Sequence, residues 1–249
     1  MQNGFRVGLF YTCLVDLMRP EIGFAALKLL EASRCEVVVP ESQTCCGQPA
    51  YNSGDRHVAR ELAEKFVREF ESFDYVVIPS GSCGGMVRAH YLDLLSDDPQ
   101  WRARMESLAQ RVYELTDFLH TVVKFRQSPN AGAGGFQGTV TYHDSCSGLR
   151  ELGVQQQPRA LLRQMPGVRL TEMKDCRNCC GFGGTFAVKY GEISAAIADE
   201  KCTNIHASGA QAVVLGDLGC MLHIEGRLRR TGDDKTRVLH VAQVLAGEG

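Results

Sequence analysis

The sequence has no excess of basic residues and no long apolar run. Its 27 Lys and Arg residues are balanced by 29 Asp and Glu, which leaves a net charge of −2. Such a chain has no positive field to attract nucleic acid or an anionic membrane surface. No apolar stretch approaches the roughly 20 residues of a membrane-spanning helix. Residues 1–10 turn polar too soon for a secretory signal, so we expect a soluble, cytoplasmic protein.

Common catalytic and nucleotide-binding motifs are missing as well. The sequence contains no H-E-x-x-H pair of zinc hydrolases and no Walker lysine. The glycine-rich stretch 181–184 does not match G-x-G-x-x-G and follows a cysteine pair rather than a clear strand. A dinucleotide site is therefore not expected there.

Cysteine, in contrast, is abundant. The chain has eleven: Cys13, Cys35, Cys45, Cys46, Cys83, Cys146, Cys176, Cys179, Cys180, Cys202 and Cys220. The number is odd and no export signal precedes them, which argues against a disulfide framework. In a reducing cytosol, so many thiols indicate metal or redox chemistry.

The cysteines follow an internal repeat. Cys13 comes after the apolar stretch 7–10, and Cys146 comes after 140–142 in the same way. A gap of 31 residues leads from Cys13 to the triplet 45–47, Cys-Cys-Gly. A gap of 32 residues leads from Cys146 to the second Cys-Cys-Gly triplet, 179–181. The two halves therefore share one plan.

The plan continues beyond the triplets. Each is followed by a helical stretch, a buried-looking strand and a cysteine in a glycine-rich turn. The strand is 75–78 before Cys83, and 212–215 before Cys220. Between the halves, residues 128–137 are small and glycine-rich, which predicts a linker joining a first half, 1–127, to a second half, 138–249.

Periodicity predicts an α/β fold. Apolar residues recur every four positions from Val58 to Phe70, as on one face of a helix, and a second stripe at spacings of three and four runs from Met105 to Leu119. Short β-branched segments such as 35–39 read as strands. We expect two pseudo-symmetric α/β halves, each with a mostly parallel sheet flanked by helices and one Cys-Cys-Gly motif. Functional groups gather at the carboxyl ends of such strands.

Each half thus offers four thiols in matching places. The first quartet is Cys13, Cys45, Cys46 and Cys83; the second is Cys146, Cys179, Cys180 and Cys220. Four thiolates suit a tetrahedral zinc ion or an iron–sulfur cluster. The adjacent cysteines favour the cluster, because neighbours point awkwardly at one ion but can bind different irons. The glycine after each pair lets backbone N–H groups approach the sulfurs.

The remaining candidates have more than one interpretation. Cys35 and Cys202 fit small apolar core residues. Cys176 forms a C-x-x-C with Cys179, which could be a redox pair, and Cys176 itself is either an occasional ligand or a thiol outside the ligand set. His143, with Asp144, could place a proton-accepting imidazole beside a cluster, or it could be a structural hydrogen-bonding residue at a strand end.

These motifs resemble the cysteine-rich CCG-domain proteins, which include the cysteine-rich component of heterodisulfide reductase and the iron–sulfur component of glycolate oxidase. The segments 45–50, 143–146 and 179–186 look most like the LutA/YkgE lactate-utilisation branch. The resemblance covers essentially the whole chain. It implies one iron–sulfur cluster per motif, and an electron-transfer role in an oxidoreductase complex that converts L-lactate to pyruvate. It also implies two partners, a ferredoxin-like iron–sulfur subunit and a third small subunit.

The chain departs from the heterodisulfide reductase component at one point. That protein ends each motif with C-x-x-C and uses five cysteines for a non-cubane cluster, whereas here the fifth positions are Met86 and His223. A four-cysteine [4Fe–4S] cluster in each half is the simpler expectation, with His223 as a candidate replacement ligand.

Two other functions stay open. Both quartets could hold zinc and only stabilise the fold; zinc could also replace lost clusters. Alternatively, the segment Gly81-Ser82-Cys83-Gly84-Gly85 after a strand imitates the G-x-S-x-G elbow with cysteine for serine, and His240 or another histidine would complete a cysteine hydrolase.

Overall fold

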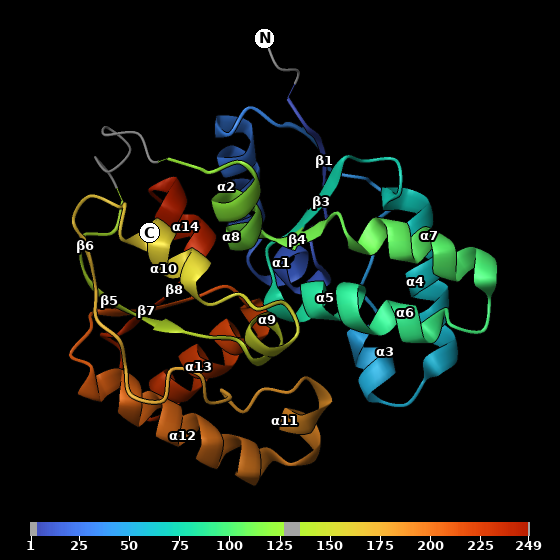
Figure 1. Cartoon of the computed structure of the whole chain (residues 1–249). Helices are drawn as coiled ribbons and strands as arrows, with labels where there is room; N and C mark the ends of the chain where they lie inside the picture. The colour runs from blue at the N-terminus through green and yellow to red at the C-terminus, as the bar shows by residue number, and fades with distance from the viewer. Residues whose placement is uncertain (1–3, 127–134, 249) are drawn as a thin grey trace.

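The computed structural model describes residues 4–126 and 135–248, which form two α/β halves (Figure 1). The first sheet has the order β2-β1-β3-β4 and the second has the matching order β6-β5-β7-β8. All neighbouring strands are parallel. The strands are β1 (Arg6–Leu9), β2 (Glu36–Val38), β3 (Tyr75–Ile78), β4 (Val112–Glu114), β5 (Gly138–His143), β6 (Val168–Leu170), β7 (Ala212–Leu215) and β8 (Arg237–His240). The predicted doubled α/β fold is confirmed.

Helices cover both sheets. In the first half they are α1 (Cys13–Met18), α2 (Pro20–Ala32), α3 (Gln48–Asn52), α4 (Arg56–Phe70), α5 (Gly81–Gly85), the π-helical η1 (Met86–His90), α6 (Tyr91–Leu94), α7 (Pro99–Ala109), α8 (Leu115–Asp117) and the π-helical η2 (Phe118–Val122). In the second half they are α9 (Cys146–Arg150), α10 (Gln156–Leu162), α11 (Thr185–Lys189), α12 (Gly191–Ala207), α13 (Leu218–Arg230) and α14 (Val241–Ala246). None of the helices in the described ranges is both long and apolar enough to cross a membrane.

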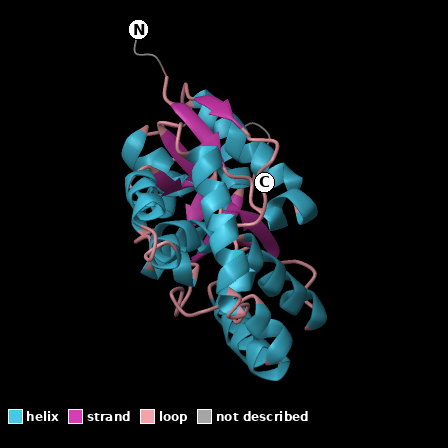
Figure 2. Cartoon of the chain, turned by 90° about the vertical axis from the view of Figure 1, so that its right-hand side faces the viewer, coloured by secondary structure: helices cyan, strands magenta, loops and turns pink. Residues whose placement is uncertain are grey.

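The central strands are apolar without interruption. All of β7 and the last three residues of β3 are buried. Continuous apolar strands are typical of parallel sheets that helices cover on both faces. The strands accordingly lie between helices in the side view (Figure 2).

The first predicted helical stripe corresponds to α4. Asp55 caps the helix by accepting a hydrogen bond from Val58 N at 3.1 Å. Phe66 and Phe70 are buried as expected, but Val58 is exposed. Ala59 and Ala63 complete the buried face instead, so this face is rotated slightly from the predicted stripe.

The second predicted stripe, from Met105 to Leu119, is not one helix. Helix α7 ends at Ala109, strand β4 follows, and only then does the chain turn helical again in α8. Val112 pairs with Val76 of β3, which adds a fourth strand to the sheet. The spacing of three and four is misleading here. Met105 and Leu108 are buried in α7, Val112 in β4 and Leu115 in α8, and these positions fall three or four residues apart by coincidence.

Helices of each half pack against helices of the other half across the interface. Helix α2 of the first half packs against α14 of the second, and α10 of the second half packs against α8 of the first. One apolar core therefore runs through residues of both halves. Most of the predicted linker, 128–134, lies outside the described residues; Phe136, at its end, is buried.

Candidate metal centres

The first cysteine quartet comes together at the carboxyl ends of its strands. Cys13 begins α1 after β1, Cys45 and Cys46 precede α3, and Cys83 lies in α5 after β3. The Sγ atoms of Cys13 and Cys45 are 3.7 Å apart, and those of Cys46 and Cys83 are 3.3 Å apart. All four cysteines line one cavity of about 270 Å³.

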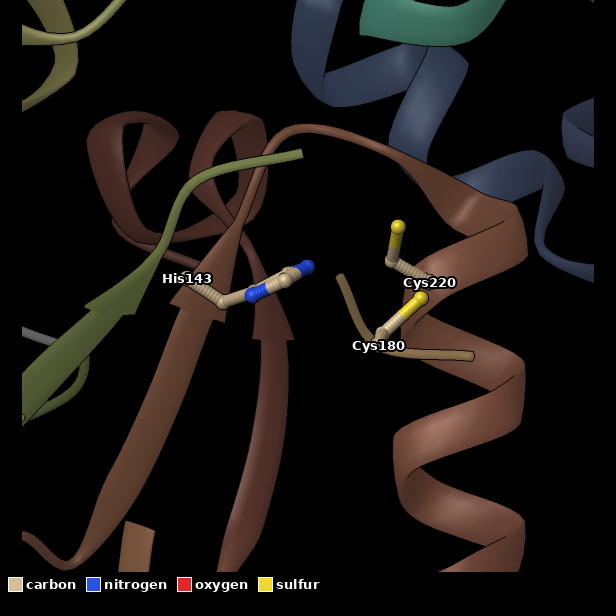
Figure 3. Close-up of side chains that lie close together, drawn as sticks. All are labelled: His143, Cys180 and Cys220. Atoms are coloured by element: carbon tan, nitrogen blue, oxygen red, sulfur yellow. The ribbon is translucent and has the colours of Figure 1, made fainter. Parts of the chain in front are cut away.

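The second quartet repeats this arrangement. Cys146 begins α9 after β5, Cys179 and Cys180 follow β6 in a loop, and Cys220 lies in the first turn of α13. All four line a cavity of about 340 Å³. The sulfurs of Cys180 and Cys220 and a ring nitrogen of His143 lie within 4.8 Å of one another (Figure 3). The structure thus brings together each predicted set of four.

Burial follows the same order in both quartets. The third and fourth members, Cys46 and Cys83 in one half and Cys180 and Cys220 in the other, are buried. The first and second members are partly exposed. Each quartet therefore has one edge in the core and one edge toward the surface.

One cysteine of each quartet is the preferred thiolate. The Cys13 thiol donates a hydrogen bond to Cys45 and, with further bonds from Cys46 and the Gly47 N–H, lowers the pKa of Cys45 to about 3. The pKa of Cys13 is raised by the same bond. Cys179 matches Cys45: bonds from Cys146, Cys180 and the Gly181 N–H lower its pKa to about 2. A metal binds thiolates, so each quartet is partly prepared for one and would release the remaining protons on binding.

The backbone N–H of the glycine in each Cys-Cys-Gly triplet donates a hydrogen bond to that thiolate. Gly47 N donates to Cys45 Sγ at 3.4 Å, and Gly181 N donates to Cys179 Sγ at 3.3 Å. Both glycines have left-handed backbones, with φ of +80° and +94°, which side chains disfavour. A Cβ on Gly181 would also lie 2.5 Å from Ser194 O. The expected approach of N–H groups to sulfur is confirmed.

A cap precedes the last cysteine of each quartet. Ser80 Oγ accepts a hydrogen bond from Cys83 N at 3.3 Å, and Asp217 Oδ1 accepts one from Cys220 N at 3.3 Å. Asp217 Oδ2 accepts two more, from Ser82 N at 2.7 Å and from Ser80 Oγ. The two caps thereby link the centres, and the two cavities share a wall formed by Gln48, Asn52, Ser82, Phe182 and Gly184.

An ion-pair network that is buried at Arg159 and Asp144 and reaches the surface at Glu172 lies near the second quartet. Arg159 makes two hydrogen bonds to Asp144, at 2.7 and 3.0 Å, and two to Glu172. Cys176 Sγ lies 3.7 Å from Arg159 Nη2, and Cys176 does not line the cavity of the quartet. Of its two interpretations, the structure favours the thiol outside the ligand set.

His143 is buried without a well-directed hydrogen bond. Its side chain is 0% exposed, and neither ring nitrogen makes a hydrogen bond of good geometry among the described residues, although the Cys176 backbone contributes a minor contact. The structure therefore gives little support to the role of a hydrogen-bonded strand-end histidine. Burial, with the nearby charge of Lys201, lowers the pKa of His143 to about 3, so the ring is neutral. His223, in contrast, has its Nε2 3.2 Å from Ser194 Oγ, and Met86 is fully buried.

The other cysteines behave differently. Cys35 and Cys202 are buried in the apolar core, as expected. Cys83, the nucleophile of the hydrolase interpretation, contacts Cys46. His240, the base of that interpretation, instead accepts a hydrogen bond from Ala242 N. Nothing in these contacts assembles a catalytic pair.

Three residues around the centres were not predicted. Ser80 and Asp217 follow strands and stand three positions before a cysteine, so the capping pattern could have found them. Arg159 had no such signal, because it reaches Asp144 only through the fold.

These donors fit a thiophilic metal group: four convergent sulfurs, N–H donors to the thiolate and, in the second half, a buried imidazole without a well-directed hydrogen bond. The model of the cysteine-rich domain CCG matches the chain twice, over residues 7–88 and 140–225. The proteins named lactate utilization protein A are similar along nearly their whole length. Those of Geobacillus kaustophilus and Bacillus subtilis are 45% and 44% identical over 240 residues, which cover 96% of this chain and 98% of each relative.

Among solved structures, a hypothetical protein from Helicobacter pylori superposes with a TM-score of 0.68 at 11% identity. The match covers 98% of this chain but only 49% of that one, so the chain spans about half its length. At this identity the similarity concerns the fold alone.

Proposed function

Since the chain belongs to the family of cysteine-rich CCG-domain proteins, together with relatives named lactate utilization protein A, we propose that it is an iron–sulfur electron carrier of lactate utilisation. Each quartet would hold one cluster, a four-cysteine [4Fe–4S] group, and the protein would act in the oxidation of L-lactate to pyruvate. The observation that carries this proposal is the convergence of four sulfurs on one cavity in each half.

Open space beside the quartets leaves room for a group larger than one ion. A zinc ion sits about 2.3 Å from each sulfur and leaves no open space among them. Each quartet borders an open cavity, of about 270 and 340 Å³, that other residues of both halves also line. Adjacent cysteines in each quartet also suit a core with several metal atoms.

A bound iron–sulfur cluster would accept and release single electrons. The chain's residues would hold it and set its potential. N–H donors such as Gly47 and Gly181 stabilise negative charge on the thiolate sulfurs, which favours the reduced state. The buried cysteines keep water from the inner edge, while the partly exposed ones leave the outer edge close to the surface for electron exchange.

The partners we propose are a ferredoxin-like iron–sulfur subunit and a third small subunit. Cys13 and Cys45 line an open groove of about 690 Å³ on the outer side of the first centre, so electrons have a short way to the surface there. All eleven cysteines are free thiols. This is consistent with the cytoplasm, where reductants keep thiols reduced.

Zinc is the second candidate, and one observation favours it. Bonds of about 2.3 Å in a tetrahedron place sulfurs about 3.8 Å apart, close to the 3.7 Å between Cys13 and Cys45. In this function the quartets would only stabilise the fold.

Anaerobic purification separates the two functions. We expect brown protein with iron and sulfide for two clusters and an EPR signal after reduction with dithionite. Zinc in an air-exposed sample does not decide, because zinc fills thiolates that have lost a cluster. Colourless protein without iron after anaerobic reconstitution would refute the carrier function.

A further inference from the structure

The two centres differ in the residue at the carboxyl end of their first strand, His143 as the last residue of β5 and Phe10 directly after β1. His143 stands three positions before Cys146, and Phe10 stands three positions before Cys13. The strand registers agree: Tyr142 is opposite Val214 as Leu9 is opposite Val77. His143 and Phe10 therefore occupy equivalent places.

Phe10 packs beside the first centre with an apolar ring. It belongs to the same packed cluster as Cys46 and Cys83. Its ring lies edge-on against Phe66, 5.1 Å between ring centres, and against Phe70 at 5.6 Å. A phenyl ring in this place needs no polar partner and offers no ligand atom.

His143 puts an imidazole in that place. Figure 3 shows the ring projecting from the end of β5 toward Cys180 and Cys220. Buried polar side chains nearly always have a hydrogen-bond partner, and one without a partner calls for a specific explanation. Here neither ring nitrogen makes a well-directed hydrogen bond, the Cys176 backbone contributes only a minor contact, and one ring nitrogen and the sulfurs of Cys180 and Cys220 lie within 4.8 Å of one another. In the described residues this is the one group of three or more such side chains close enough to share a metal atom.

We propose that His143 is a nitrogen ligand of the second centre, which is thereby a four-cysteine, one-histidine site, while the first centre has cysteine ligands alone. This inference rests on the proposed metal-binding function. A neutral imidazole donates its nitrogen lone pair to iron without adding charge, as histidines do in Rieske clusters. The metal atom bound by Cys180 or Cys220 then differs from its neighbours.

Pulsed EPR tests the ligand directly. The full-length protein is loaded anaerobically, reduced, and prepared with natural-abundance and with ¹⁵N-labelled histidine. We expect a strong nitrogen coupling in the unlabelled protein that changes to the ¹⁵N pattern on labelling. His143→Phe, which copies the first half, should lose the coupling and keep the signal of the first centre. If that variant does not fold, His143→Gln gives the same comparison.

His223→Gln is the matched control, because His223 lies next to the Gly181 turn of the second quartet, and His90→Gln is a second control, because His90 lines the cavity of that quartet. The coupling in both controls should equal that of the wild type. A loaded wild-type protein without histidine coupling would overturn the inference and leave the carrier function intact. Coupling that survives His143→Phe or disappears in either control would also overturn it. Protein that binds no iron would instead refute the proposed function.

Discussion

Ser80 and Asp217 join the two centres: Ser80 Oγ donates a hydrogen bond of 3.0 Å to Asp217 Oδ2. Each residue caps the helix that carries the last cysteine of its own quartet. The bond is buried and crosses from one half to the other. A substitution at either residue should therefore lower the metal content of both centres.

Asp217→Ala removes three hydrogen bonds to one carboxylate, from Ser80, Ser82 and Cys220. We expect a loss of about 2–4 kcal/mol in the free energy of unfolding, measured with denaturant, and less metal in both centres. Asp55→Ala is the control, since Asp55 caps α4 away from the quartets. It should cost about 1 kcal/mol and leave the metal content unchanged. Equal metal content in both variants would contradict the linking role.

Cys45→Ser should empty the first centre and leave the second. Cys45 is the preferred thiolate of its quartet, and the harder oxygen of serine binds the iron of a cluster less well than a thiolate. We expect about half of the iron and sulfide, by chemical analysis of anaerobic protein. Cys202→Ser, in the core and outside both quartets, should keep the full amount. Full iron content in Cys45→Ser would remove Cys45 from the ligand set.

Comparing Gly181→Ala with Gly209→Ala separates the free-energy cost of a left-handed backbone from the cost of a steric clash. Gly181 and Gly209 both have positive φ, but a Cβ meets Ser194 O at 2.5 Å in the first and nothing within 4 Å in the second. Gly209→Ala should cost about 1–2 kcal/mol for the left-handed backbone. Gly181→Ala should cost about 1–3 kcal/mol more from the clash and shift the midpoint potential of one cluster. Equal stabilities would mean that the loop relaxes freely.

His240 should make stability depend on pH. Burial lowers its pKa to about 4 from 6.5. Between these values the unfolded chain binds a proton that the folded chain does not, so stability falls as the pH drops from 6.5 toward 4. The loss approaches about 1.4 kcal/mol per pH unit. His240→Asn, which keeps a capping side chain at α14, should show a flatter acid limb in denaturant titrations. His57→Asn, at an exposed position, should follow the wild type.

Arg159→Met should destabilise the protein strongly, because it leaves Asp144 buried with no cation. We expect a cost of about 3–5 kcal/mol in denaturant unfolding. In the double variant with Asp144→Leu, part of that stability should return. Arg56→Met breaks the exposed pair with Asp93 and should change little. A small effect of Arg159→Met would show that water reaches Asp144.

The sequence was informative where a pattern is local or repeated. The eight cysteines could be grouped because both halves carry the same spacing, and parallel strands bring their carboxyl ends together. Strand β4 was missed because Val112 takes its place by pairing with Val76, a contact across 36 positions that periodicity does not record. The role of Arg159 and the helix contacts between the halves were missed for the same reason. Their partners are set by the packing of the whole chain, not by neighbours in sequence.

The packing of helices between the two halves has a consequence for the symmetry of the molecule. Since α2 and α10 hold equivalent places in the two halves, as do α14 and α8, the contacts α2–α14 and α10–α8 are the same contact made twice. Contacts that are returned in this way characterise isologous, two-fold dimers. The chain therefore has the architecture of an isologous dimer within one polypeptide, with each half using the same pair of helices to hold the other.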